Sequence, residues 1–145
     1  MSDKALAFFE AANPDSVNIT EATIDAQFRN FVEEIQETFS ALQTLKHPGA
    51  ESARENIVYY LTQLQKTEGP LGLETQDLEV LDGLCDIAVA GQGLAYVLGY
   101  DYVGAKNAVD DANLSKVVDG AVIRTASGKI AKPATYAAPD LTPFI

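Results

Sequence analysis

Two groups of acidic residues have the type and spacing that metal chemistry requires. The first group is Glu33, Glu34 and Glu37, and the second is Asp82 and Asp86. Residues three and four positions apart share one face of a helix, so each group would present its carboxylates together. Carboxylates in apolar surroundings carry a desolvation cost unless a cation faces them. Oxygen ligands gathered by two packed helices suit Mg²⁺ or Mn²⁺ better than zinc, and we therefore expect a metal site.

The alternative interpretation is that both groups are solvated helix faces. That interpretation suits Glu33, Glu34 and Glu37 taken alone, because glutamate is common on exposed helices. Asp82 and Asp86 are different, because aspartate is a poor helix former and apolar residues flank both positions. The two groups together favour a metal site.

The apolar residues predict the helices that must position these carboxylates. A helical pattern begins after Thr20, a suitable N-cap, and continues to residue 45. Further helices are predicted over residues 50–66, 75–98 and 101–116. The third is the most apolar, without lysine or arginine, which is typical of a helix surrounded by others. Gly91 and Gly93 would permit close approach of a neighbour, and Gly99 suits the position that ends this helix.

These elements predict an all-α fold, a four-helix bundle with an irregular C-terminal arm. Residues 1–19 form an N-terminal segment, residues 20–118 the four-helix domain, and residues 119–145 the arm. Glycine, proline and short alternating stretches in the last segment predict a hairpin-like or extended structure.

Composition narrows the possible function classes. The 145 residues carry a formal net charge of −11, which argues against a protein that grips nucleic-acid phosphates. A small anionic substrate remains compatible if metal ions mask the local negative charge. The single cysteine excludes an intrachain disulfide, and we expect neither a signal peptide nor a membrane span. These features predict a cytoplasmic protein.

An ordered set of motifs resembles the MazG-like all-α nucleoside triphosphate pyrophosphohydrolases, and in particular their small, phage-type branch. The set covers about residues 25–141 and comprises the two acidic groups, Gly99-Tyr100-Asp101, Asn113-Leu114-Ser115-Lys116, Asp119-Gly120, Ser127-Gly128-Lys129, and Lys132 to Tyr136 followed by Pro139-Asp140-Leu141. One departure is Gly83, where many relatives have the glutamate of an ExxD pattern. Asp82 or Glu79 would then supply that ligand.

The resemblance implies a four-helix MazG-like bundle that hydrolyses a nucleoside triphosphate to the monophosphate and pyrophosphate. It implies two or three Mg²⁺ or Mn²⁺ ions per site, held by Glu34, Glu37, Asp82 and Asp86. Glu33 would be a fifth ligand or the base that orients the attacking water, with Glu34 beside it.

Several polar side chains are candidates for contacts with the substrate. Asn113 and Lys116 share a predicted helical face and would bind phosphate, although a lysine near a helix C-terminus also complements the helix dipole. Lys129 is a further candidate from the arm, as are Lys132 and Arg124. Asn30, one turn before the first acidic group, would read the base or ribose.

The resemblance also leads to expectations about the nucleotide and the oligomeric state. From the phage-type branch we expect dGTP or GTP, and from the family a homodimer or homotetramer. One alternative keeps the fold and takes phosphoribosyl-ATP as substrate. Another is a catalytically silent helical protein that uses the bundle for dimerisation or interaction.

Overall fold

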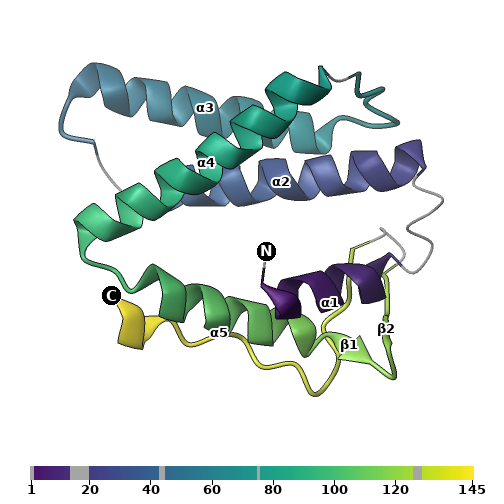
Figure 1. Cartoon of the computed structure of the whole chain (residues 1–145). Helices are drawn as coiled ribbons and strands as arrows, with labels where there is room; N and C mark the ends of the chain where they lie inside the picture. The colour runs from purple at the N-terminus through teal and green to yellow at the C-terminus, as the bar shows by residue number, and fades with distance from the viewer. Residues whose placement is uncertain (1, 14–19, 43–44, 75, 126–128) are drawn as a thin grey trace. The chain divides into compact units, whose positions relative to one another are not determined.

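A computed structural model of the chain describes residues 2–13, 20–42, 45–74, 76–125 and 129–145 (Figure 1). The chain divides into two compact units: Met1–Val17 with Thr75–Ile145, which we call unit 1, and Asn18–Glu74, which we call unit 2. The described residues form five α-helices, one short 3₁₀ helix and a two-stranded sheet. The predicted all-α character is confirmed, whereas the four-helix bundle stays a prediction.

Unit 2 is an antiparallel pair of helices, α2 (Glu21–Ala41) and α3 (Pro48–Lys66). The predicted N-cap of α2 is confirmed, because the hydroxyl of Thr20 accepts a hydrogen bond from the backbone N–H of Thr23 at 3.2 Å. At the start of α3, His47 is the N-cap and Pro48 is in the first turn, where a missing N–H costs nothing.

Two arginines fasten the ends of this helix pair. The guanidinium of Arg29 on α2 donates to the carbonyls of Gln65, Thr67 and Gly69 at 2.8–3.0 Å, where α3 ends. At the opposite end, the guanidinium of Arg54 on α3 donates to the carbonyl of Phe39 near the end of α2. Each arginine thus satisfies carbonyls that the partner helix leaves without an intrahelical donor.

Each arginine also pairs with a carboxylate of its own helix. Arg29 donates to Asp25 at 3.1 Å, and Arg54 donates to Glu51. Glu51 accepts a further hydrogen bond from the backbone N–H of Leu45 at 2.7 Å. The bonds from Arg54 and Leu45 lower the pKa of Glu51 to about 2, so this carboxylate stays ionised well into the acidic range.

In unit 1 the helices α1 (Asp3–Ala12) and α5 (Tyr102–Leu114) lie side by side (Figure 1). The sequence pattern predicted no helix over residues 3–12. Ser2 caps this helix, and the apolar residues Ala5, Phe8 and Ala12 recur at helical spacing and are buried. Ten residues are too few for a stable isolated helix, so packing against the rest of unit 1 supplies its stability.

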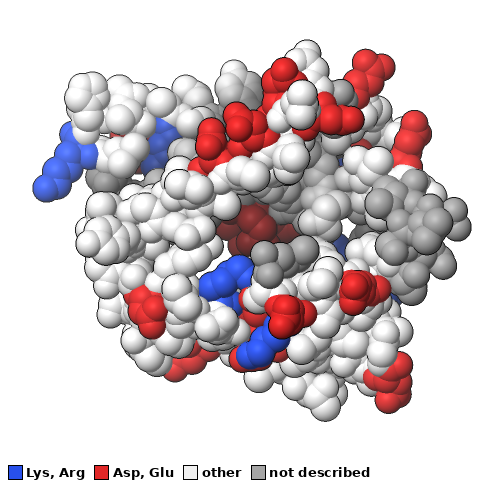
Figure 2. Space-filling model, viewed as in Figure 1, with Lys and Arg blue, Asp and Glu red and all other residues white. Residues whose placement is uncertain are grey.

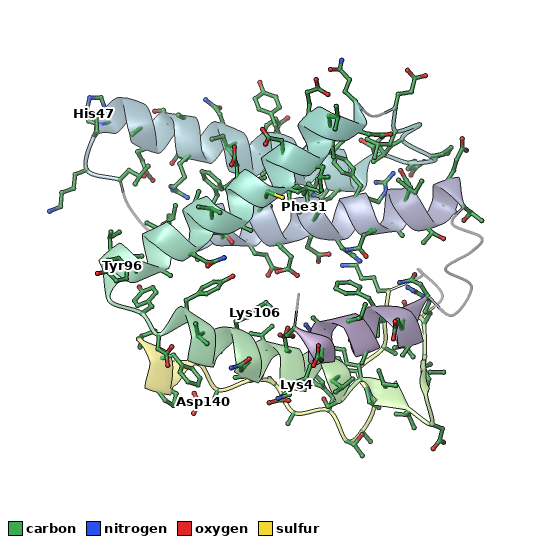
Figure 3. All side chains as sticks on the ribbon, viewed as in Figure 1. Lys4, Phe31, His47, Tyr96, Lys106 and Asp140 are labelled. Carbon is green, nitrogen blue, oxygen red and sulfur yellow. The ribbon has the colours of Figure 1, made fainter. Side chains whose placement is uncertain are left out.

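Charged groups fix α1 along α5. Asp110 on α5 is 3% exposed and accepts hydrogen bonds from the hydroxyl of Ser2 and the ammonium of Lys106, at 2.5–2.6 Å. Lys4 pairs with Asp111 at 2.5 Å; Lys4 and Lys106 are labelled in Figure 3. Burial raises the pKa of Asp110, but the bonds from Lys106 and Ser2 outweigh burial and keep the pKa below its usual value.

Helix α4 (Asp77–Leu98) ends as predicted at Gly99, whose φ of 83° is in the left-handed region. Its apolar side chains are exposed, in contrast to the prediction of a helix surrounded by others. They are Leu78, Val80, Leu81, Leu84, Ile87, Val89, Leu94, Tyr96, Val97 and Leu98. By length and composition alone α4 is long and apolar enough to cross a membrane, and the expectation of no span stays a prediction.

The expected hairpin-like arm is present. Strands β1 (Val117–Val118) and β2 (Ala121–Val122) pair antiparallel, and the turn residues Asp119 and Gly120 both have positive φ, 52° and 79°. Such a turn matches the twist of the flanking strands, and Asp-Gly is a preferred sequence for it. Antiparallel pairing continues beyond the strands, where the N–H of Ala131 donates to the carbonyl of Ile123 at 2.7 Å.

The end of the arm closes onto the start of α5. The 3₁₀ helix η1 (Thr142–Phe144) provides the carbonyl of Phe144, which accepts from the N–H of Asp101 at 2.9 Å. Asp101 in turn caps α5 by accepting from Gly104, and Asp140 accepts from the N–H of Thr142 at 3.0 Å. The bonds from Thr142 lower the pKa of Asp140. Asp101 therefore caps α5 with its side chain, and its N–H joins the start of that helix to the end of the arm through Phe144.

Candidate functional site

The first acidic group lies in the second half of α2, within unit 2. Glu33 is half-buried, whereas Glu34 and Glu37 are exposed. Helix α2 is continuous over these positions, so their spacing places the carboxylates along one side of the helix as expected. Asn30 is exposed one turn earlier on the same helix, where its predicted contact with base or ribose stays a prediction.

The second acidic group lies on α4, within unit 1. Asp82 and Asp86 are exposed and four residues apart in one continuous helix, and Glu79 precedes them in the same exposed stretch. Gly83, the position of the missing ExxD glutamate, has open space around it, because a Cβ added there would meet nothing within 4 Å. The choice between Asp82 and Glu79 as the additional ligand therefore stays open.

The predicted metal cage would combine carboxylates from both units. Within the part of the chain that the structure describes, no three side chains of the types His, Cys, Asp and Glu gather closely enough to hold a metal ion. The two acidic groups belong to different units. The cage, with Glu34, Glu37, Asp82 and Asp86 as ligands, stays a prediction.

The structure brings the two predicted phosphate ligands of α5 together. The ammonium of Lys116 donates to the side-chain oxygen of Asn113 at 2.7 Å. Ser115, between them in sequence, donates to the carbonyl of Ala112 at 2.7 Å and thereby helps to end α5. Helix α5 ends at Leu114, so Lys116 lies in the turn that follows it and not on the expected helical face. Binding of phosphate by the pair stays a prediction.

Two aromatic rings surround the Lys116 ammonium. Its nitrogen lies 5.8 Å from the ring centre of Phe8 on α1 and 5.5 Å from that of Tyr136 in the arm. The nitrogen of Lys132 lies 5.2 Å from the same Tyr136 ring. At these distances the electron-rich faces of the rings attract a cation. Phe8 of α1 and Tyr136 of the arm therefore both lie beside Lys116, and Tyr136 also lies beside Lys132.

Lys129 contributes its backbone to the arm. Its carbonyl accepts from the N–H of Thr125 at 2.8 Å and from the Thr125 hydroxyl at 3.2 Å, and its side chain is exposed. Ser127 and Gly128, the rest of its predicted turn, lie outside the described residues. Arg124 donates to the carbonyl of Ala12 at 2.8 Å, where α1 ends.

Sequence reasoning missed the supporting roles of Phe8 and Tyr136. Phe8 is more than a hundred positions from Lys116, and no local pattern relates them. Tyr136 is four positions after Lys132, and its N–H donates to the carbonyl of Pro133 at 2.9 Å, which forms a turn. That lysine–tyrosine spacing around a proline was the available signal for the Lys132–Tyr136 pair.

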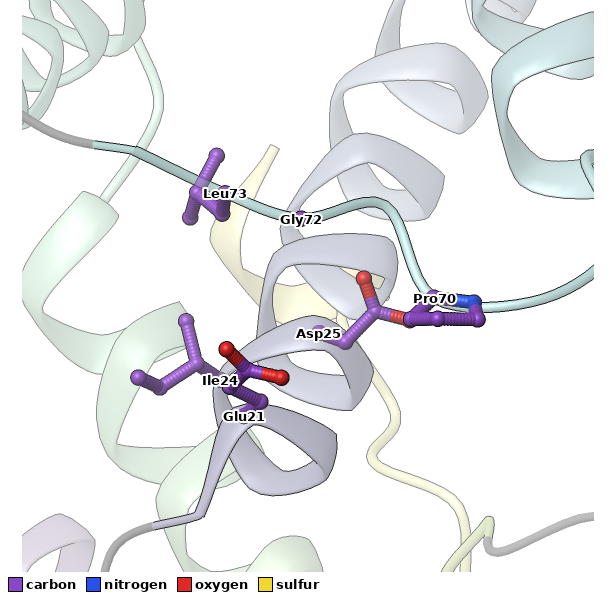
Figure 4. Close-up of a pocket in the computed structure, with 6 residues that line it drawn as sticks. All are labelled: Glu21, Ile24, Asp25, Pro70, Gly72 and Leu73. Atoms are coloured by element: carbon purple, nitrogen blue, oxygen red, sulfur yellow. The ribbon is translucent and has the colours of Figure 1, made fainter.

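A shallow pocket in unit 2 lies apart from these candidates. Its lining comes from the start of α2 and the segment after α3, and Figure 4 shows all six residues: Glu21, Ile24, Asp25, Pro70, Gly72 and Leu73. The carboxylate of Asp25 already binds Arg29 and the N–H of Leu71. Glu33 lies about two helical turns further along α2, so this pocket does not contain the predicted metal ligands.

Charge is unevenly distributed along the chain. Acidic side chains outnumber basic ones on the face shown in Figure 2. Residues 113–139, which we call the basic segment, have the opposite balance, with Asp119 as their one acidic residue and Lys116, Arg124, Lys129 and Lys132 as basic residues. The rest of the chain therefore has six basic and twenty acidic residues. The basic residues are therefore more frequent in this segment than in the rest of the chain.

Comparison of the chain with protein-family models, with curated proteins and with solved structures found no match. The resemblance to the MazG-like family therefore depends on the residues and motifs quoted above.

Proposed function

We propose that this protein is a metal-dependent nucleotide pyrophosphohydrolase, which converts a nucleoside or deoxynucleoside triphosphate to the monophosphate and pyrophosphate. The observation that carries the proposal is the helical spacing of the acidic groups on α2 and α4, both of which are continuous helices. The side-chain contact between Asn113 and Lys116 adds support from a second motif of the same ordered set.

The donor chemistry fits Mg²⁺ or Mn²⁺, because every predicted ligand is a carboxylate oxygen. Glu34, Glu37, Asp82 and Asp86 would hold the ions, with Glu79 as the alternative partner of Asp82. When bound, such ions neutralise phosphate charge and favour ionisation of the attacking water.

The protein's own side chains would share the remaining tasks. Glu33 either completes the ligand set or accepts a proton from the water that attacks the α-phosphorus. Lys116 binds phosphate, with Asn113 fixing the direction of its ammonium. Asn30 contacts the base or ribose, and Lys129 approaches from the arm. The preferred base is guanine in this proposal, as dGTP or GTP.

The direct test is release of pyrophosphate from a panel of the eight common ribo- and deoxyribonucleoside triphosphates, with Mg²⁺, with Mn²⁺ and with a chelator. We expect metal-dependent pyrophosphate release that is greatest with dGTP or GTP. Orthophosphate as product would mean that the attack occurs at another phosphorus. No cleavage of any triphosphate would favour the helical interaction protein, and cleavage of phosphoribosyl-ATP alone would favour that substrate.

We further propose that the protein is a homodimer or homotetramer. The exposed apolar side chains of α4 support this, since large apolar surfaces are usually covered in solution; Tyr96, labelled in Figure 3, is 83% exposed. Light scattering at micromolar concentration should give a multiple of the 15.5 kDa chain mass. The mass of a single chain would contradict the proposal.

A further inference from the structure

Helix α4 has one apolar stripe whose spacing is typical of paired helices. Its residues are separated alternately by four and three positions: Val80, Leu84, Ile87, Gly91, Leu94 and Leu98, which we call the seam. This spacing keeps them on one side of a continuous helix, as the core positions of a coiled coil are. The five large side chains are 44–52% exposed, so the described residues leave the seam about half uncovered.

The opposite side of α4 is less suited to pack against another helix. The residues with the same spacing there are Leu78, Asp82, Cys85, Val89, Gln92 and Tyr96. The carboxylate of Asp82 and the amide of Gln92 would be costly to bury in an apolar contact. Asp82 and Asp86 both lie off the seam, so a partner on the seam leaves these proposed metal ligands uncovered.

The sizes of the seam residues match when two copies of α4 run in opposite directions. Antiparallel pairing places Val80 opposite the partner's Leu98 and Leu84 opposite the partner's Leu94. Ile87 then lies opposite the partner's Gly91, where the missing side chain leaves room for it. Parallel pairing would instead place Gly91 opposite Gly91 and leave a void in the contact, which costs free energy.

The charges of α4 favour the same direction. Its four acidic residues all lie in the first half of the helix, and residues 87–98 contain no charged side chain. Parallel pairing would align the two acidic halves, and like charges repel. Antiparallel pairing places each acidic half beside the uncharged half of the other copy. It also brings the positive end of each helix dipole near the negative end of the other.

We propose that α4 of one copy packs antiparallel against α4 of a second copy through the seam, with the middle of the contact level with Val89. Such a contact has two-fold symmetry, in which both copies use the same residues. Self-association as such rests on the proposed function, whereas the choice of α4 and the direction of pairing rest on the seam and on the charges of the helix.

The first test compares one seam variant with a matched variant on the opposite side. Ile87→Asp places two unpaired carboxylates in the contact and should weaken association at least about a hundredfold. Light scattering at micromolar concentration should then give half the mass of the wild type. Val89→Asp introduces the same charge two residues away, at a side chain that is 68% exposed, and should keep the wild-type mass. Circular dichroism should show unchanged helical content in both variants.

A residue exchange tests the direction of pairing. Gly91→Ile alone places two isoleucines opposite each other and should weaken association by overpacking. Ile87→Gly alone leaves a void and should also weaken it. The double variant Ile87→Gly/Gly91→Ile has the composition of the wild type and restores one large residue opposite one glycine, so it should recover the wild-type mass. Isoleucine is used because a single methyl group, as in alanine, is small enough to be accommodated beside Ile87.

Crosslinking with a short bismaleimide gives an independent measure of the direction, in a Cys85→Ser background that removes the native thiol. Ala88 lies beside the seam near its middle, so the two copies of Ala88→Cys should crosslink. The two copies of Leu98→Cys should not, because antiparallel pairing separates them by about 27 Å along the helices, at 1.5 Å per residue. Parallel pairing would place the two copies of Leu98→Cys together.

Four results would overturn the proposal: a single-chain mass for the wild type, a wild-type mass for Ile87→Asp, equal losses in Ile87→Asp and Val89→Asp, or crosslinking of Leu98→Cys without Ala88→Cys. Pyrophosphate release is measured separately on the wild type. A dimer that depends on the seam but cleaves no triphosphate would contradict the proposed reaction and keep this interface. Cleavage of a triphosphate by a protein whose mass is insensitive to Ile87→Asp would do the reverse.

Discussion

Helices α4 and α5 are neighbours in sequence, yet the fold supports them very differently. Helix α5 is covered by α1, capped by Asp101 at its start and contacted there by η1 at the end of the arm. Helix α4 is longer and more apolar, but its apolar side chains are exposed. The phosphate ligands proposed on α5 are thus positioned by contacts within unit 1. The carboxylates of α4, by contrast, lie on an exposed helix.

The same difference separates the basic and the acidic parts of the proposed site. The Lys116 ammonium has an amide and two rings around it, whereas Asp82 and Asp86 project from an exposed helix. The side chains proposed to bind phosphate are thus held by contacts within the folded chain itself. The acidic part would be completed by metal ions and by packing of α4.

The largest expected effect is on catalysis, from the acidic part. Glu37→Ala and Asp86→Ala should each lower the rate of pyrophosphate release about a hundredfold or more, since each removes a ligand that stabilises charge in the transition state. Circular dichroism should show unchanged helical content in both variants. Glu55→Ala, an exposed glutamate of α3, is the control and should keep full activity. Pyrophosphate release at the wild-type rate in both Glu37→Ala and Asp86→Ala would contradict the predicted metal cage.

The second-largest expected effect is on the stability of unit 2. Its two helices, like α5, are held by side-chain contacts with a neighbouring element. Arg29→Met removes the bonds to the carbonyls that follow α3, and should lower the free energy of unfolding in urea by about 2–3 kcal/mol. Arg29→Lys should recover little of this loss, because an ammonium lacks the planar fork of donors. An Arg29→Met protein as stable as the wild type would show that this contact does not fasten α3 to α2.

A pair of glycine variants contrasts α5 with α4 directly. At Gly104 on α5, a new Cβ would lie 2.6 Å from the Phe144 ring. Gly104→Ala should therefore lower the free energy of unfolding by about 1–3 kcal/mol. At Gly91 on α4, nothing lies within 4 Å of that position, and Gly91→Ala should stabilise the helix by up to about 1 kcal/mol.

The Gly91 variant also tests how α4 is covered. If a neighbouring helix approaches closely at Gly91, as the sequence suggested, an added methyl group would clash and Gly91→Ala would lose stability or dissociate the oligomer. Thermal unfolding and light scattering distinguish the two results. Equal changes in the free energy of unfolding for Gly91→Ala and Gly104→Ala would contradict the difference in packing between α4 and α5.

The smallest effect is a pH dependence in the α1–α5 contact. The pKa of Asp110 is lowered in the folded protein, so its ionised form stabilises the fold above the usual pKa of aspartate. This stabilisation is lost as the pH falls through the lowered pKa. Urea unfolding as a function of pH should show a shallower acid loss in Asp110→Asn than in the wild type. If the free energy of unfolding falls equally with pH in both proteins, then protonation of Asp110 does not weaken the α1–α5 contact.

The local features of the fold were largely predictable from sequence. Thr20 and Gly99 marked helix ends correctly because capping is a short-range effect. The Asp119-Gly120 turn confirmed the expected hairpin for the same reason. Helix α1 was not predicted, because its stability comes from packing against residues a hundred positions away.

The candidate site was predictable only where one helix carries it. Asn113 and Lys116 meet because they are three residues apart at the end of α5. The contacts of Lys116 with Phe8 and Tyr136 depend on tertiary packing, which no spacing rule describes. The predicted grouping of the α2 and α4 carboxylates would likewise depend on contacts between residues distant in sequence, and a functional measurement is needed to test it.

The central claim is attack of water on the α-phosphorus of a nucleoside triphosphate. Hydrolysis of dGTP in ¹⁸O-labelled water with Mg²⁺, followed by mass spectrometry of the products, tests it most directly. The account predicts that the label enters the nucleoside monophosphate and that the pyrophosphate is unlabelled. Label in pyrophosphate or in orthophosphate, or no turnover of any of the eight triphosphates, would contradict it.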